Sequence, residues 1–172
     1  MNQLNFPVKL CNWILNFLLD RPQIVKVGDL SSSVIVLNTG SPQGCPCSPK
    51  FYSLFTHDCV ATFSDIHVFK FADDTTVTGL ITDNNEDKYR QEIKNIVHWC
   101  DDNNLILNVS KTKELIIDFK RNKSPIEPLF INDKEVEIID VFKFLGTFVT
   151  NDISWHVRVK SEKQMVLIYI WF

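Results

Sequence analysis

The stretch His67–Thr78, HVFKFADDTTVT, predicts the feature around which the fold is built. Strand-forming side chains alternate with polar ones on both sides of two adjacent carboxylates, Asp73 and Asp74. Neighbouring aspartates disfavour a continued strand, so we expect two strands joined by a tight turn with the acids at its tip. Two anions about 6 Å apart repel by roughly 3 kcal/mol at an effective dielectric of about 20. A bound Mg²⁺ would offset that repulsion, because it accepts one or two carboxylates together with water and phosphate. The alternative is an ordinary polar turn with two solvated aspartates.

Composition places the chain among globular proteins. Its 172 residues are 45% hydrophobic and 12% aromatic, which is enough for one compact domain with a core. The net charge of −3 argues against a free-standing, strongly basic nucleic-acid binder. The N-terminus lacks a basic region followed by a long apolar core, and the apolar run Met165–Phe172 is too short to span a membrane. We therefore expect an intracellular protein, nuclear or cytoplasmic, with no membrane partner.

The five cysteines are odd in number and scattered, which favours a reducing compartment and no disulfide framework. Cys45, Cys47, His57 and Cys59 could be imagined as zinc ligands. Their C-x-C and H-x-C spacings lack the usual C-x₂-C form, and Cys59 falls where we expect a helix to bury it. The pattern therefore disfavours zinc.

Helix and strand patterns alternate along the first half of the chain. We expect a helix over Phe6–Leu19, with Pro7 in its first turn, and a hairpin of strands Gln23–Val27 and Ser33–Leu37. Two glycines and three prolines make Asn38–Pro49 a shaped loop, and a helix over Lys50–Phe63 follows.

The second half continues with a helix over 86–103, introduced by Asp83 and Glu86 at capping-box spacing. A strand at Glu114–Phe119 comes next. The remaining segments predict a small antiparallel set and a final helix over Trp155–Trp171; the set comprises Phe130–Ile131, Val136–Ile139 and Phe142–Val149. This order predicts an α+β fold whose sheet is antiparallel.

Three further segments could carry chemistry. The loop TGSPQG would let backbone N–H groups approach a nucleotide, or is a plain connector. The lysines of Asn108–Lys113, NVSKTK, could neutralise a polyphosphate, or begin a solvated strand. The stretch Phe142–Gly146, FKFLG, would allow close approach of another backbone, or belongs to the core.

Taken together and in this order, these segments resemble the reverse transcriptase domain of non-LTR retrotransposons. The resemblance covers nearly the whole chain. It includes Trp13…DRPQ (20–23), TGSPQG followed by Cys45–Pro49, FADDT, the stretch Trp99–Glu114 and FKFLGTFV (142–149). The loop departs from the common pattern, since Cys-Pro-Cys (45–47) stands where Cys-Val-Leu is expected. Pro46 would stiffen or distort the start of the helix that follows.

The resemblance implies roles for particular residues. Asp73 would be the principal ligand of catalytic Mg²⁺, with Asp74 as its neighbour. Gln43 and Gly44 would position the incoming nucleotide and the template, and either Lys111 or Lys113 would lie next to the triphosphate. The primer grip would be formed by Phe144, Leu145 and Gly146.

The resemblance also implies an architecture and partners. Residues 1–150 would form a partial palm of a right-handed polymerase with a small part of the fingers, and 151–172 the start of a thumb-leading helix. RNA template, DNA primer and deoxynucleotides would bind to the intact enzyme, together with the remainder of a polyprotein.

Two-metal nucleotidyl transfer needs more than one acidic turn. The family carries a further aspartate on an adjoining strand, in a segment that precedes the first helix here. Asp20, Asp58 and Asp65 lack the apolar strand before them that would place them beside Asp73. We therefore expect a reverse transcriptase fragment that is inactive alone.

Two alternatives use the same residues differently. A non-catalytic remnant would bind nucleic acid or protein; its basic surface would comprise Lys111, Lys113, Lys120, Arg121, Lys123, Arg158, Lys160 and Lys163. A phosphotransferase with Asp73 as nucleophile is disfavoured, because Asp-Asp-Thr lacks the Asp-x-Asp spacing of that chemistry.

Overall fold

The computed structural model describes residues 5–72, 74–83, 85–118, 126–152 and 164–171. Within the last range, the side chains of 164, 165, 167, 169 and 171 are not described. The chain divides into two compact units, Met1–His57 and Asp58–Phe172, and each is described by itself.

The first unit begins with helix α1, Val8–Leu18, which confirms the helix predicted over Phe6–Leu19. Pro7 occupies the N-cap position, and the Leu19 N–H closes the last turn on the Leu15 carbonyl. The apolar stripe of α1 remains largely uncovered: Ile14 is buried, whereas Trp13 is 52% exposed.

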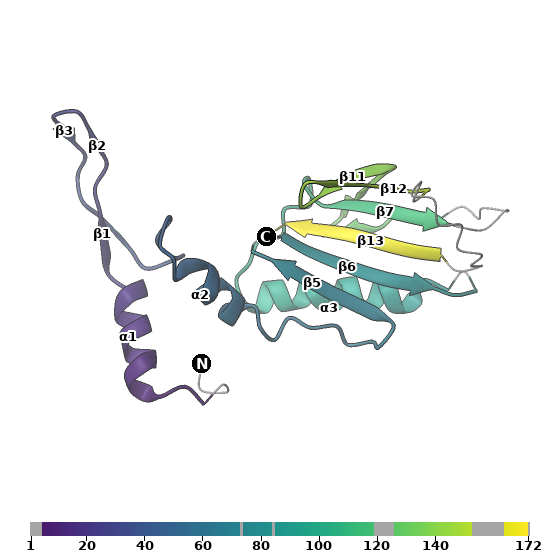
Figure 1. Ribbon diagram of the computed structural model, residues 1–172, viewed down its shortest axis with the longest axis horizontal. Helices are drawn as coiled ribbons and strands as arrows, with labels where there is room; N and C mark the ends of the chain where they lie inside the picture. Colours follow the sequence, from purple (N-terminus) through teal and green to yellow (C-terminus); the bar gives the residue numbers. More distant parts are fainter. Residues whose placement is uncertain (1–4, 73, 84, 119–125, 153–163, 172) are drawn as a thin grey trace. The chain divides into compact units, whose positions relative to one another are not determined.

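Four short strands follow α1 as a twisted ribbon (Figure 1). Strand β1 (Arg21–Gln23) pairs antiparallel with β4 (Ile35–Leu37), and β2 (Lys26–Val27) pairs with β3 (Leu30–Ser31). Gly28 supplies the positive φ, 59°, that the tight turn between β2 and β3 requires. The predicted hairpin is therefore confirmed.

Helix α2, Ser48–Phe55, is shorter than the helix predicted over Lys50–Phe63. The helix ends at Thr56, whose hydroxyl bonds back to the Tyr52 carbonyl, while the His57 ring lies 2.8 Å from the Leu54 carbonyl oxygen. These local bonds satisfy the last carbonyls, which helps to end the helix. The expectation that Cys59 lies on a helix is wrong, although Cys59 is buried.

The second unit is built on a sheet of five strands in the order β10-β7-β13-β6-β5 (Figure 1). The strands of this sheet are β5 (Ile66–Phe71), β6 (Asp74–Ile81), β7 (Lys113–Asp118), β10 (Glu137–Ile139) and β13 (Gln164–Trp171). Neighbouring strands are antiparallel except β10 and β7, which are parallel. The predicted mixture of helices and an antiparallel sheet is confirmed. The prediction that Val136–Ile139 belongs to a small antiparallel set is wrong, because β10 pairs parallel with β7 in the main sheet.

The helix predicted at the end of the chain is wrong over 164–171, because this segment forms the central strand β13. Residues 153–163 of that prediction lie outside the described part. β13 pairs with β6 on one side and β7 on the other, and Val166, Ile168 and Ile170 are buried. A short apolar run fits a buried helix or a buried strand equally well. Here the strand forms because the run can pair with the edges of both β6 and β7. The segment is therefore part of the second unit's sheet, not a separate extension.

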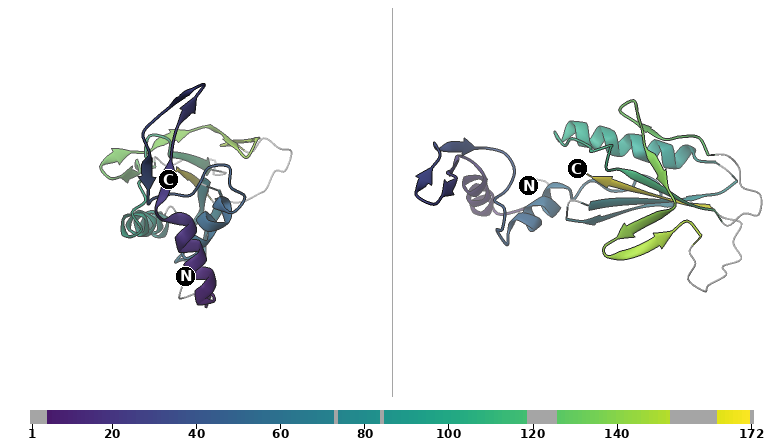
Figure 2. Two further views of the ribbon diagram at one scale, coloured as in Figure 1. Left: turned by 90° about the vertical axis from the view of Figure 1, so that its left-hand side faces the viewer. Right: turned by 90° about the horizontal axis from the view of Figure 1, so that it is seen from above.

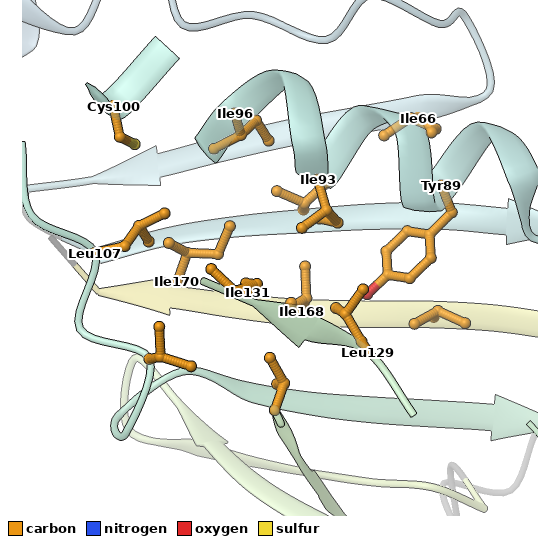
Figure 3. Close-up of a cluster of buried hydrophobic side chains, with 14 of the residues drawn as sticks. Ile66, Tyr89, Ile93, Ile96, Cys100, Leu107, Leu129, Ile131, Ile168 and Ile170 are labelled. Carbon is orange, nitrogen blue, oxygen red and sulfur yellow. The ribbon is translucent and has the colours of Figure 1, made fainter. Parts of the chain in front are cut away.

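Helix α3, Asp87–Asp102, covers one face of this sheet and confirms the helix predicted there. Its buried side chains meet those of the strands in the main core, where Ile93 and Ile96 face Ile168 and Ile170 (Figure 3). Tyr89 reaches across this core, and Gly79 leaves room for its ring, since a Cβ there would come within 3.1 Å of it. The predicted capping box is wrong: no side chain of Glu86 caps the helix, and the Asn85 side chain accepts the Asp87 N–H at 2.9 Å.

Two small hairpins complete the second unit. β8 (Phe130–Ile131) pairs with β9 (Lys134–Glu135), and β11 (Val141–Phe144) pairs with β12 (Thr147–Thr150). The hairpin β11–β12 lies on the face of the sheet opposite α3 (Figure 2, right). One face of the sheet therefore carries the main core, and the other faces this hairpin.

Candidate functional site

The acidic turn connects β5 to β6 as predicted. Phe71 and Asp74 are the last register pair of the hairpin, so the chain turns directly after Phe71, at Ala72. Ala72 has φ 52°, the left-handed conformation that two-residue hairpin loops favour. Asp73 lies outside the described residues, whereas Asp74 is the half-buried first residue of β6.

Asp74 opens onto a pocket of about 430 Å³ on the face of the sheet away from α3. The wall is mainly apolar and is shared by β5, β6, β7, β10 and the β11–β12 hairpin. It comprises Phe69, Lys70, Phe71, Asp74, Thr76, Thr78, Lys113, Leu115, Ile139, Phe142, Phe144, Leu145 and Val149. Four residues singled out from separate sequence motifs, Asp74, Lys113, Phe144 and Leu145, thus line one cavity.

One carboxylate oxygen of Asp74 lacks a partner. Asp74 Oδ1 is buried and accepts no hydrogen bond among the described residues, and the same holds for the hydroxyl of neighbouring Thr76. A buried carboxylate oxygen without a donor is costly unless a cation or a ligand pairs with it. Asp74 therefore fits Mg²⁺, which needs only one or two protein carboxylates and completes its shell with water and phosphate.

The described residues do not form a complete metal cage. Among them, no group of three or more His, Cys, Asp or Glu side chains is placed to hold a metal ion. Of the set considered for zinc, Cys45, Cys47 and His57 belong to the first unit and Cys59 to the second. A cation at Asp74 would accordingly depend on Asp73 and on oxygen atoms of a bound ligand.

Lys113 enters the pocket wall from β7. Its Nζ forms an ion pair with Glu137 and donates to the Ser110 carbonyl at 3.1 Å. Glu137 is the register partner of Lys113 in the parallel pairing of β10 and β7. Sequence reasoning missed Glu137, because nothing local indicates that this strand pairs beside Lys113.

The structure distinguishes the two candidate lysines, because one of them lines the pocket and the other does not. Lys111 lies in a turn organised by Asn108, whose side-chain oxygen accepts the Ser110 hydroxyl at 2.7 Å and the Lys111 N–H at 3.3 Å. Lys113 lines the pocket and Lys111 is not among its wall residues. The geometry thus associates Lys113 with Asp74.

The tip of the β11–β12 hairpin holds the segment compared with a primer grip. Leu145 has φ 46° and Gly146 has φ 90°, so both turn residues are left-handed. A bulky residue such as leucine is strained at positive φ, and Asn or Gly would fit this turn better. Leu145 nevertheless occupies the position, is 53% exposed and lines the pocket. The turn therefore places a strained leucine side chain in the pocket wall.

Gln43 and Gly44 belong to the first unit, not to the unit that carries the pocket. Gly44 has φ 76°, in a turn where the Cys45 N–H lies 3.4 Å from the Pro42 carbonyl oxygen. The Ser48 hydroxyl donates to the same carbonyl at 2.6 Å. The loop therefore has the tightly turned backbone that its glycines and prolines predict.

Of the other aspartates considered from the sequence, Asp58 and Asp65 have partners for their carboxylates. Asp58 accepts the Trp99 indole N–H at 3.2 Å, and Asp65 pairs with Lys88 at 3.0 Å. That hydrogen bond from Lys88 lowers the pKa of the Asp65 carboxyl. The Asp20 N–H donates to the Asn38 side chain. The predicted basic surface lies mostly outside the described residues, namely Lys120, Arg121, Lys123, Arg158, Lys160 and Lys163.

Comparison with known families agrees with the motifs. The family described as "Reverse transcriptase (RNA-dependent DNA polymerase)" matches residues 1–149. The chain therefore belongs to the reverse transcriptase family. No curated protein and no solved structure gives a significant match. No helix among the described residues is long and apolar enough to cross a membrane.

Proposed function

We propose that this chain is the palm and part of the fingers of an RNA-directed DNA polymerase of the non-LTR retrotransposon type. Asp73 and Asp74 hold Mg²⁺, Lys113 contacts the triphosphate, and Phe144–Gly146 contacts the primer. Gln43 and Gly44 help to position the incoming nucleotide and the template. The observation that carries the proposal is the pocket in which Asp74, Lys113, Phe144 and Leu145 share one wall.

The chemistry of each wall suits this use. Bound Mg²⁺ would neutralise phosphate charge and activate the attacking hydroxyl. Lys113 adds a positive charge that would attract the polyphosphate. Glu137, which pairs with Lys113 in the structure, would compete with the polyphosphate for this charge. Phe144 and Leu145 give an apolar surface that excludes water from the end of a nucleic-acid strand.

We further propose that these 172 residues do not polymerise by themselves. The strand beside β6 at the acidic turn is β13, and the register partner of Asp74 is Trp171. The β13 sequence, QMVLIYIW, contains no carboxylate. A second metal site therefore needs an acid that this strand does not supply, and the remainder of a polyprotein would be its source.

Primer extension on an RNA template, with Mg²⁺ and all four deoxynucleotides, tests catalysis directly. We expect no extension by the chain alone. Extension that disappears in Asp73→Asn would overturn the inactivity and support the polymerase assignment. Extension that survives in both Asp73→Asn and Asp74→Asn would contradict the roles given to the two acids.

Nucleotide binding tests the pocket without requiring catalysis. Titration with a fluorescent Mg²⁺–deoxynucleotide should give binding that weakens about tenfold in Lys113→Met, since a charge-assisted hydrogen bond contributes about 1.5 kcal/mol or more. Lys134→Met is the matched control, because Lys134 is exposed on β9. If the two substitutions weaken nucleotide binding equally, Lys113 does not contact the triphosphate.

A second candidate function is a non-catalytic module, acting inside the cell, that binds nucleic acid or protein. The observation that favours it is β13, which completes the sheet beside Asp74 without adding an acid. At a net charge of −3, we expect weak, salt-sensitive binding of RNA or DNA. Titration at two salt concentrations tests this expectation, because nanomolar binding at physiological salt would contradict it.

A further inference from the structure

The five cysteines fall into distinct environments. Cys59 and Cys100, in the second unit, are 4% and 1% exposed. Burial raises the pKa of both thiols, that of Cys100 to about 12, so neither forms a thiolate readily. Cys11, Cys45 and Cys47, in the first unit, are half-buried and free. Of these, Cys45 and Cys47 stand two positions apart on the loop that enters α2.

The loop holds these two cysteines in one turn. The Ser48 N–H donates to the Cys45 carbonyl at 3.1 Å, which closes the turn around Pro46. The Cys47 N–H donates to Cys45 Sγ at 3.4 Å, and this bond is the main cause of the lowered pKa of the Cys45 thiol. This bond stabilises the Cys45 thiolate, which is the form that attacks a disulfide.

The spacing also suits a bond between the two sulfurs. Cys47 has helical dihedral angles, φ −83° and ψ −22°. At helical spacing, Cα atoms two residues apart are separated by about 5.4 Å, from the rise and radius of the helix. Disulfides span Cα separations of about 4.4–6.8 Å. Side chains two residues apart do not face each other at helical spacing, so closing the disulfide requires a local rearrangement of the turn.

We propose that Cys45 and Cys47 form a thiol–disulfide switch at the start of α2, in which Cys45 attacks and Cys47 resolves. The Cys45 thiolate attacks one sulfur of a small disulfide such as glutathione disulfide, forms a mixed disulfide and releases one glutathione thiolate. Cys47 then loses its proton to solvent, attacks the Cys45 sulfur and releases the second glutathione. Two protein thiols are oxidised while one small disulfide is reduced.

The switch would alter the loop that carries Gln43 and Gly44. The new bond would close a small ring directly after Gly44 and change the backbone of the turn that enters α2. The inference rests on the loop itself and does not depend on the polymerase assignment. A reducing compartment would keep the pair open until the small-disulfide pool becomes oxidised.

Peptide mapping of the full chain tests the switch. The folded protein is incubated with glutathione disulfide, alkylated and digested with trypsin, which yields one peptide, Val27–Lys50, containing both cysteines. We expect this peptide to lose the mass of two hydrogens, resist alkylation and return to the dithiol form with dithiothreitol. Cys11 is the internal reference, and we expect it to react several-fold more slowly.

Two variants separate the roles of the sulfurs. In Cys47→Ser, the glutathione adduct should accumulate on Cys45, because no resolving thiol remains. In Cys45→Ser, adduct formation on Cys47 should be several-fold slower than on Cys45 in the first variant. The proposal is overturned if Cys45 reacts no faster than Cys11, or if Cys47→Ser accumulates no adduct.

Discussion

The two units of this chain bury very different amounts of apolar surface. In the second unit, α3 and the five-stranded sheet enclose a continuous core in which Val77, Ile168 and Ile170 are fully buried. Of the residues that the structure describes in the first unit, Ile14 is the one buried apolar side chain. Both units are rich in Val, Ile, Leu and Phe. The difference lies in topology, because two short helices and a thin ribbon form no sheet-and-helix layers that could cover their apolar faces.

The largest expected effect is loss of core packing in β13. Ile168→Ala should destabilise the chain by about 2–5 kcal/mol, because it removes buried methylenes from the centre of the sheet. Val36→Ala, at a position on β4 that is 56% exposed, should stay within about 0.5 kcal/mol. Urea unfolding of the full chain, followed by circular dichroism, measures both. Similar losses for the two variants would break the comparison between the units.

The pH dependence of stability should report a buried acid in the second unit. Glu114 is 2% exposed and accepts the Tyr89 hydroxyl at 2.8 Å, while its Oε2 has no hydrogen-bond partner among the described residues. Burial raises the pKa of the Glu114 carboxyl in the folded protein from 4.5. Its contribution is therefore complete below about pH 4.5 and is lost as the pH rises through the folded-state pKa, at up to about 1.4 kcal/mol per pH unit.

Glu114→Gln keeps an acceptor for Tyr89 and cannot ionise, so unfolding free energies measured from pH 4 to pH 8 should lose this slope. Glu92→Gln is the matched control at another buried glutamate. Glu92 accepts the N–H groups of Thr62 and Phe63 at 2.9 and 3.2 Å, so its amide variant should cost about 1–3 kcal/mol instead. An unchanged slope in Glu114→Gln would refute the assignment.

The smallest effect concerns the turns of the two units. Leu145→Asn should stabilise the second unit by up to about 1 kcal/mol, because Asn tolerates the left-handed conformation better than Leu. Gly28→Ala, in the turn between β2 and β3, should have the opposite sign, since Ala is strained at φ 59°. Thermal unfolding of both variants gives the comparison. If Leu145→Asn instead destabilises the protein, the side chain of Leu145 contributes packing that outweighs its strain.

Local patterns predicted much of the second unit correctly. The alternation around Asp73 and Asp74 predicted the β5–β6 hairpin, and the helix predicted over 86–103 corresponds to α3. Elements decided by neighbours were predicted badly. The run Met165–Trp171 was assigned to a helix, although it fills the space between β6 and β7. Helix α2 ends earlier than the sequence predicts, because its end depends on the local bonds of Thr56 and His57.

The sequence was sufficient to indicate the family, the acidic turn and the segments that line the pocket, because each depends on a few residues that are close together along the chain. It could not indicate that Lys113 faces Glu137, that Leu145 joins Asp74 at one cavity or that β13 lies beside β6. Those contacts join residues far apart in the chain. They form only when strand pairing and burial of the core select one arrangement among many with similar local preferences.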